Sequence, residues 1–167
     1  MAQEINVAEV RLSGLMPTVD PDDIRRLVEK SGRTNTAAVG TTTTVPEHVI
    51  YTAERPSIVK KVLVTPEAEV AGADNVNYST VVFYKRTAVT PGTAITFFSA
   101  TTSTTASGGV GTLTAWTRNS LAGFDNDITK RKLAEGDVVT FAVLKTATTG
   151  VTFPAAMIEC LVGELSD

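Results

Sequence analysis

Segment 138–145 constrains the fold of this chain more than any other part of the sequence. In an extended strand its side chains alternate between two faces, with Val139, Phe141 and Val143 on one face and Val138, Thr140, Ala142 and Leu144 on the other. Because both faces are largely apolar, the pattern predicts a strand that is central in its sheet or covered on both sides. The turn Gly136-Asp137 precedes this strand, and a second apolar strand at 156–162 follows it. The end of the chain therefore predicts a β-sheet protein.

Further strand patterns recur along the chain from Ile58 onward. The predicted strands cover 58–65, 78–86, 95–100, 113–117 and 128–133, with turn sequences such as Pro91-Gly92 between them. Together with the two strands above, they come at the spacing of a β-sandwich. We therefore expect residues 57–167 to form one antiparallel β-sandwich domain of jelly-roll or immunoglobulin-like topology. An up-and-down barrel fits less well because several connections are long.

Residues 1–56 differ from the rest in composition, and we expect them to form an extended N-terminal arm. Asp20-Pro21-Asp22-Asp23 is typical of a helix start, with Asp20 as the N-cap and Pro21 at the first helical position. Ile24, Leu27 and Val28 follow at helical spacing. The pattern predicts one short helix at about 21–31, which Gly32 ends.

The second half of the arm contains no further helix signal. Residues 31–44 are rich in Ser, Gly, Thr, Asn and Ala, which is the composition of a linker. Residues 45–52 form a predicted edge strand, because Pro46 near its start is tolerated only where a backbone N–H is not needed. We place the boundary to the sandwich near Arg55-Pro56.

The composition excludes several classes of function. The 167 residues are 43% hydrophobic, which is enough for one core, and a net charge of −3 gives no electrostatic footprint for nucleic acid. No apolar run approaches the ~20 residues that span a bilayer. The first residues lack the pattern of a signal peptide. We therefore expect a protein that is made in a cytoplasm and binds neither nucleic acid nor membrane.

Few side chains offer catalytic chemistry. His48 is the only histidine, which rules out Ser-His-Asp, Cys-His and multi-histidine metal sites. Cys160 has no partner for an intrachain disulfide and lies in an apolar strand, so we expect a buried structural thiol. The run Gly108-Gly109-Val110-Gly111 opens a predicted strand and not the helix of a phosphate-binding loop. The sequence predicts no catalytic residue, no cofactor and no enzyme.

A calcium site is the alternative to consider for the acidic loops. Asp125-Asn126-Asp127, Asp74-Asn75 and Asn77 supply oxygen ligands of the kind that Ca²⁺ prefers. The same residue types also cap turns by accepting hydrogen bonds from their own backbone. Because no repeated calcium motif is present, we favour turn capping and assign no metal ligand.

The aromatic residues and the basic clusters have structural interpretations. Nearly all aromatic side chains, Trp116 and Tyr84 included, fall in or beside predicted strands, so we expect them to pack in the core. Lys60-Lys61 and Lys130-Arg131-Lys132 lie beside predicted strands. We interpret both as solvated charges at sheet edges, where they discourage aggregation.

Residues 58–165 resemble the β-sandwich domains of tailed-phage virion proteins, especially head decoration proteins and head fibres. The resemblance lies in the order of five segments: Val62-Leu-Val-Thr-Pro66, Ala73-Asp-Asn-Val-Asn-Tyr78, Ser79-Thr-Val-Val-Phe-Tyr-Lys-Arg86, Leu133-Ala-Glu-Gly-Asp137 and Gly150-Val-Thr-Phe-Pro154. It implies a non-enzymatic structural protein, often a homotrimer, that binds the major capsid protein on the outer surface of the virion and stabilises the shell. Residues 1–56 match no family.

The arm is the expected contact with the capsid or with a neighbouring protomer, because an arm that orders on binding can cross-link subunits. The residues predicted to bind the partner are Val7, Val10, Ile24, Leu27 and Val28. Two alternatives stay open. One is a carbohydrate-binding or adhesin-type module, which predicts a solvent-exposed Trp116 or Tyr84 on a concave face. The other is a tail or baseplate component of the same virion.

Overall fold

The computed structural model describes residues 29–38, 45–70, 78–103, 109–145 and 152–165. Within these ranges the chain forms nine strands and one short 3-10 helix. The elements are β1 (Glu29–Thr36), β2 (Val45–Thr52), β3 (Ser57–Pro66), β4 (Ser79–Arg86), β5 (Ala94–Thr101), β6 (Asn119–Leu121), η1 (Ile128–Arg131), β7 (Lys132–Leu133), β8 (Val138–Lys145) and β9 (Ala156–Glu164). None of the helices in these ranges is long and apolar enough to cross a membrane.

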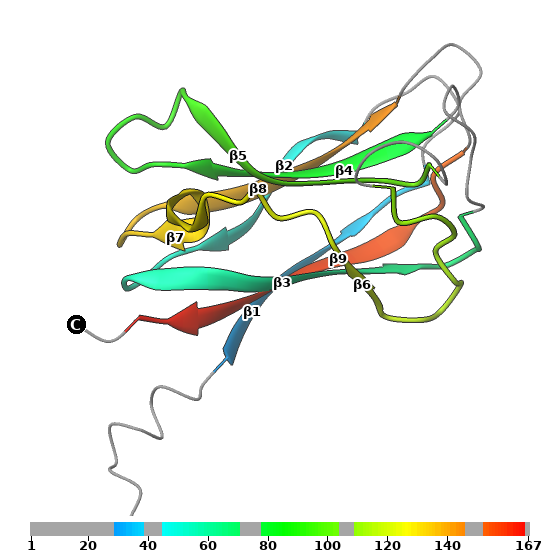
Figure 1. Cartoon of the computed structure of the whole chain (residues 1–167), viewed down its shortest axis with the longest axis horizontal. Helices are drawn as coiled ribbons and strands as arrows, with labels where there is room; N and C mark the ends of the chain where they lie inside the picture. Colours follow the sequence, from blue (N-terminus) through cyan, green and yellow to red (C-terminus); the bar gives the residue numbers. More distant parts are fainter. Residues whose placement is uncertain (1–28, 39–44, 71–77, 104–108, 146–151, 166–167) are drawn as a thin grey trace, which may run out of the picture.

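The strands form two antiparallel sheets. A five-stranded sheet has the order β1-β9-β3-β6, with β7 also pairing with β3, and a four-stranded sheet has the order β2-β8-β4-β5. Figure 1 shows the two sheets as layers that face each other, with β4, β5 and β8 in one layer and β1, β3 and β9 in the other. Each sheet buries one face against the other, as two packed sheets do. The predicted antiparallel β-sandwich is confirmed.

Segment 138–145, which constrains the predicted fold most, forms a central strand of the four-stranded sheet. β8 lies between β2 and β4, so the prediction of a central strand is confirmed. Phe141 pairs with Phe83 on β4 and with His48 on β2. The side chains of β8 that face the other sheet lie in the hydrophobic core. The largest fully buried side chains of this core are Phe83, Phe97, Phe98, Phe141, Phe153 and Ile158.

The N-terminal boundary of the sandwich lies earlier in the chain than the sequence predicted. β1 pairs with β9 from Glu29 opposite Gly163 to Thr36 opposite Ala156, and β2 pairs with β8. Where the structure describes residues 29–56, they therefore belong to the sandwich, and the predicted arm with its boundary at 56 is wrong for this part. The small polar residues of 31–36 were interpreted as linker, but their backbone groups complete the edge of a sheet whose apolar residues lie on β9.

The prediction of a helix at about 21–31 is wrong for its last three residues, because residues 29–31 belong to strand β1. Its other residues lie outside the described ranges. The predicted edge strand at 45–52 is confirmed as β2, which ends the four-stranded sheet and has Pro46 at its second position.

Two other predicted strands take a different form. Residues 113–117 are not a strand: only Leu113 forms a bridge, with Val70, and a turn follows. Residues 128–133 begin as the helix η1, because the Asp127 side chain accepts from the Thr129 N–H and caps it, and only Lys132–Leu133 continue as β7. The short strand β6 carries no sequence pattern long enough to predict.

Candidate functional site

The outer face of the four-stranded sheet carries a group of apolar side chains, of which Val49 and Leu144 are exposed. We call it the apolar strip and define it as Val49, Val82, Tyr84, Ala142 and Leu144. Val82 lies opposite Ala142, and both Tyr84 and Val49 lie opposite Thr140. These residues alternate with the buried Val81, Phe83, Phe141 and Val143, so they face away from the core.

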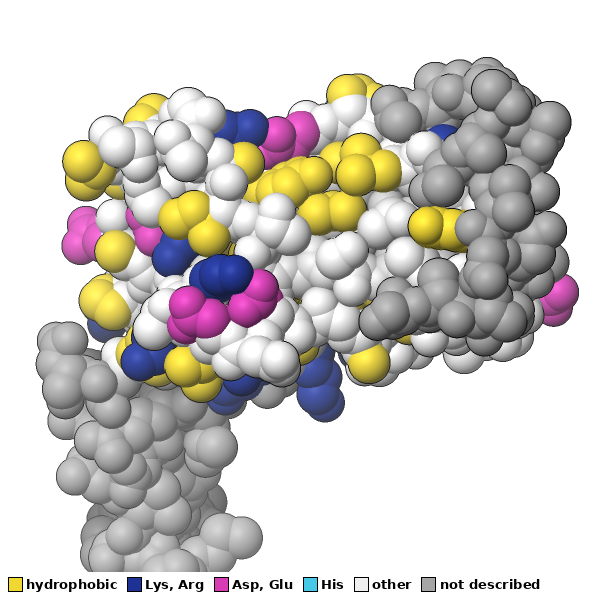
Figure 2. Space-filling view, turned by 45° about the horizontal axis from the view of Figure 1, so that its top comes forward, with side chains coloured by type: hydrophobic (Ala, Val, Ile, Leu, Met, Phe, Trp, Pro, Cys, Tyr) yellow, Lys and Arg dark blue, Asp and Glu magenta, His cyan; other side chains and the backbone are white. Residues whose placement is uncertain are grey.

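The strip is exposed to different degrees along its length. Val49 keeps 62% of its surface and Leu144 keeps 40%, whereas neighbouring side chains bury Val82 and Ala142. In Figure 2, which brings the upper side of Figure 1 forward, hydrophobic side chains gather on this face beside a charged pair. The exposed aliphatic side chains of the strip are in contact with water, and their removal from water is favourable.

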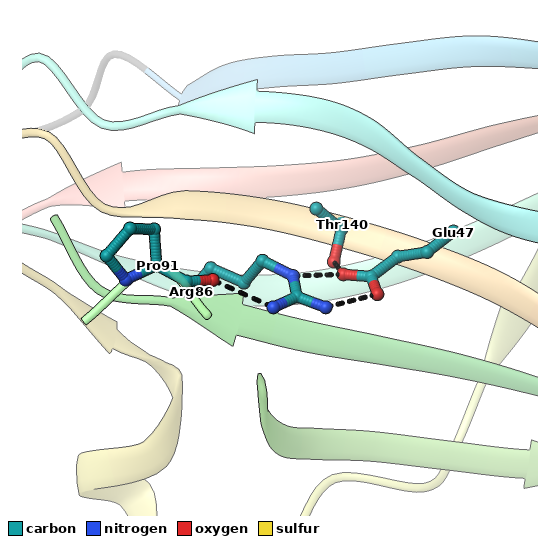
Figure 3. A network of polar contacts seen from close by, with 4 residues as sticks. All are labelled: Glu47, Arg86, Pro91 and Thr140. Atoms are coloured by element: carbon teal, nitrogen blue, oxygen red, sulfur yellow. Dashed lines mark hydrogen bonds and ion pairs between the residues drawn. The ribbon is translucent and has the colours of Figure 1, made fainter. Parts of the chain in front are cut away.

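A polar network borders the strip and joins three strands (Figure 3). The Arg86 guanidinium on β4 donates from Nε and Nη2 to the two carboxylate oxygens of Glu47 on β2, both at 2.6 Å. The Thr140 hydroxyl on β8, between these strands, donates to Glu47 Oε1. Arg86 Nη1 also donates to the Pro91 carbonyl oxygen at 2.8 Å. The fork geometry fixes the edge strand β2 and the β4–β5 hairpin relative to each other.

The network shifts the ionisation of both partners. Hydrogen bonding to Arg86 lowers the pKa of Glu47 below its ordinary value of 4.5; burial opposes this shift, and the Thr140 hydroxyl adds a smaller lowering effect. Glu47 in turn raises the pKa of Arg86. Glu47 is therefore ionised across the whole neutral range, and the network is intact there.

Glu47 is expected to make the stability of the fold fall as the pH is lowered. Its pKa is lower in the folded chain than in the unfolded chain, so its contribution is fully present above the unfolded value near 4.5 and is lost as the pH falls through the folded value. Glu47→Gln is expected to lower the free energy of unfolding by about 1 kcal/mol at pH 7 and by less at pH 3. Urea denaturation at the two pH values measures both differences.

The matched control is Glu54→Gln, because Glu54 is 79% exposed and pairs only with Lys30 among the described contacts. Its substitution is expected to change stability little at either pH. An equal loss for Glu47→Gln at pH 7 and pH 3 would contradict an ionised Glu47 bound to Arg86.

Trp116 does not lie in the core, contrary to the sequence-based expectation. It keeps 74% of its surface exposed and has a φ of 54°, the only positive φ of a residue other than glycine in the described ranges. Such a backbone conformation costs on the order of 1 kcal/mol for a bulky L-residue. The expectation was wrong because residues 113–117 form a turn, and Trp116 lies at the turn position that needs a left-handed backbone. The expectation is also wrong for Tyr84, which lies half-buried on the outer face of β4. The five core phenylalanines named above confirm the expectation for those positions.

The acidic loop considered for calcium has the geometry of turn caps. Asp125 Oδ1 accepts from the Asp127 N–H at 2.8 Å, and Asp127 Oδ1 accepts from the Thr129 N–H at 2.9 Å. Asp125 Oδ2 pairs with Lys130 Nζ at 2.6 Å. These carboxylates already have partners, and the described residues contain no group of three or more His, Cys, Asp or Glu side chains arranged for a metal ion. Asp74, Asn75 and Asn77 lie outside the described ranges.

His48 and Cys160, the two single residues considered above for catalytic chemistry, both lie in strands of the sandwich. His48 is exposed on β2, with its ring 5.9 Å from that of Phe141. Cys160 is fully buried in β9, as expected, and burial raises the pKa of its thiol to about 12. A thiol with that pKa remains protonated at neutral pH and is a poor nucleophile.

The residues predicted to bind a partner, Val7, Val10, Ile24, Leu27 and Val28, lie outside the described ranges. Glu47 and Arg86, in contrast, were not identified from the sequence. They lie 39 residues apart and meet only through the register of β2, β8 and β4, for which no short motif exists.

The fold defines the class of this chain as an antiparallel β-sandwich with an apolar strip and a bordering ion pair on one outer sheet face. Comparison with models of protein families, with curated proteins and with solved structures found no match in any of the three.

Proposed function

We propose that this chain is a non-enzymatic structural protein of a tailed-phage virion that binds the outer capsid surface as a trimer and stabilises the shell. The observation that carries the proposal is the apolar strip on the four-stranded sheet. Val49 and Leu144 leave aliphatic surface in water on an otherwise well-packed sandwich, and contact with another protein surface removes it. The proposal also draws on the resemblance to head decoration domains, which lies in segments of β3 and β4 and in the segments that precede β8 and β9.

The proposal divides the contacts between two parts of the chain. The strip contacts a neighbouring protomer, and the fixed Glu47–Arg86 pair beside it supplies charges whose orientation is set before association. Residues 1–28 contact the major capsid protein through Val7, Val10, Ile24, Leu27 and Val28. Residues 29–56 are left out of this second contact, because β1 and β2 belong to the sandwich.

The number of copies in virions tests the proposal first. In particles purified by density gradient, quantitative mass spectrometry is expected to give a ratio to the major capsid protein of about one to one, or of about one trimer per local three-fold position. A ratio of a few copies per hundred would instead indicate a tail or fibre component. Absence from the particles would reject the virion assignment.

Two variants separate the proposed contacts. Deletion of residues 1–28 leaves every described strand in place and is expected to abolish binding to purified capsids while the sandwich stays folded. The double variant Val49→Asp with Leu144→Asp keeps that segment and is expected to turn the trimer into a monomer in sedimentation velocity. Ser120→Asp is the control for the double variant, because it adds a charge at an exposed position of β6 in the other sheet.

A further inference from the structure

Trp116 is presented to solvent by a loop that is held on both sides. Before it, Leu113 is buried and exchanges two backbone hydrogen bonds with Val70, at 3.0 and 2.9 Å. At the tip, the Trp116 N–H donates to the Pro66 carbonyl oxygen at 2.8 Å. The backbone from which the indole projects is therefore held by the end of β3 and by the segment that follows it.

The Asn119 side chain holds the inside of the same loop. Its Nδ2 donates to the carbonyl oxygens of Thr114 at 3.0 Å, Thr117 at 2.6 Å and Val64 at 3.2 Å, and its Oδ1 accepts from the Thr114 N–H at 3.1 Å. One side chain thus contacts three backbone groups of the turn and one of β3, with its two N–H groups shared among three carbonyl oxygens, and so ties the turn to β3. A loop ordered in this way loses little conformational entropy when a ligand binds.

The surroundings of Trp116 are polar. Thr114, Thr117, Arg118 and Ser120 are exposed on the same loop and on β6. Arg118 is held in place by two hydrogen-bonded contacts to the buried Glu159, at 3.0 and 2.7 Å. The other large exposed hydrophobic residues of the described ranges are Val49, Val89, Ile128 and Leu144, which lie on β2, the β4–β5 hairpin, η1 and β8. None of them lies on the Trp116 loop or on β6.

This combination distinguishes between two kinds of partner. The centre of a protein interface needs several apolar side chains side by side, with the polar groups at the rim. A pyranose ring needs one flat aromatic face for its C–H groups and hydrogen-bonding side chains around it for its hydroxyl groups. A single exposed indole, on a loop whose backbone is held in place and that carries threonine, serine and arginine side chains, fits the second requirement.

We propose that Trp116 is the stacking surface of a carbohydrate-binding site, which takes a pyranose residue of a polysaccharide or surface glycan. The hydroxyl and guanidinium groups of Thr114, Thr117 and Arg118 lie at its rim. The Trp116 loop leads into β6 of the five-stranded sheet, whereas the apolar strip lies on the four-stranded sheet. The carbohydrate site does not depend on the proposed virion function.

The test uses the full chain on an array of immobilised glycans that includes bacterial cell-surface polysaccharides. Wild-type protein is expected to bind one class of glycan, and Trp116→Ala is expected to lower the apparent affinity at least tenfold. Trp116→Phe, which keeps an aromatic face, is expected to retain part of the binding. Val89→Ala is the control, because Val89 is 90% exposed on a different loop. Trp116→Gly serves as a second loss variant, since glycine adopts a φ of 54° without strain.

Fluorescence gives an independent readout, because Trp116 is the only tryptophan. Titration with the soluble form of the glycan found on the array is expected to shift the emission to shorter wavelength as the indole leaves water. No glycan signal from the wild type, or a signal that Trp116→Ala leaves unchanged, would overturn the proposal. A blue shift that appears on concentrating the protein alone would also overturn it, because the indole would then pack against a second copy.

Discussion

Replacement of Phe141 by alanine is expected to lower the free energy of unfolding by about 4 kcal/mol, the largest effect of any single truncation considered. Phe141 is fully buried at the centre of β8. Its ring lies 6.0 Å from that of Phe83, which in turn makes an edge contact with Phe98 at 5.6 Å. Removal of the ring leaves a cavity between strands that are hydrogen-bonded on both sides and cannot collapse into it.

Chemical denaturation followed by circular dichroism measures this loss. Val89→Ala is the matched control, because it truncates an apolar side chain on the β4–β5 hairpin that is 90% exposed and lies outside the apolar strip, and it is expected to change stability by less than about 0.5 kcal/mol. If Phe141→Ala does not fold, Phe141→Leu gives a smaller loss in the same direction. Equal stability of the Phe141 and Val89 variants would mean that the two sheets do not pack through this ring.

Gly32→Ala is expected to destabilise the fold by about 3 kcal/mol, an unusually large effect for the addition of one methyl group. A Cβ at position 32 would collide with the carbonyl oxygen of Ile50 and lie 2.7 Å from Cβ of Tyr51. Both neighbours belong to β2 in the opposite sheet, whereas Gly32 lies in β1 opposite Cys160. The absence of a side chain at residue 32 therefore sets how closely the edges of the two sheets approach.

Gly92→Ala is the control for this substitution. Gly92 has no heavy atom within 4 Å of the position that a Cβ would take, and its φ lies outside the left-handed region, so alanine is expected to be neutral or slightly stabilising there. Thermal unfolding of the two variants side by side makes the comparison. A Gly32→Ala variant as stable as the wild type would show that β1 does not lie against β2.

The sequence predicts those strands whose side chains follow a hydrophobic pattern. β3, β4, β8 and β9 alternate or are continuously apolar, because one or both of their faces are buried, and hydrophobic periodicity identifies them. β1 contributes little apolar surface: apart from Gly32, which is needed for close approach of the two sheets, it is built of polar and charged residues. Its pairing with β9 is a contact between backbones, which leaves no trace in hydrophobic periodicity.

The candidate sites were less accessible to prediction, for two physical reasons. Glu47 and Arg86 meet through strand register, which shifts at a bulge between Val45 and His48 and cannot be derived from either strand alone. Trp116 was expected in the core because a tryptophan in a short apolar stretch is usually buried. Its exposure follows from a turn stabilised by Asn119, and the asparagine three residues later was the only sequence signal for that turn.

The pairing of β1 with β9 has a consequence for how the chain reaches its native state. β9 lies between β1 and β3, and the Thr36 hydroxyl donates to the carbonyl oxygen of Ala156, 120 residues away. During synthesis, β1 and β3 leave the ribosome long before the strand that joins them, and each has an unpaired edge until β9 arrives. The five-stranded sheet therefore closes last, through contacts that are distant in sequence, and such contacts make folding slow. The four-stranded sheet is also incomplete for most of that interval, because β8 joins β2 to β4 and is made only shortly before β9. Until then the nascent chain depends on charged residues at its strand edges to avoid pairing with other chains.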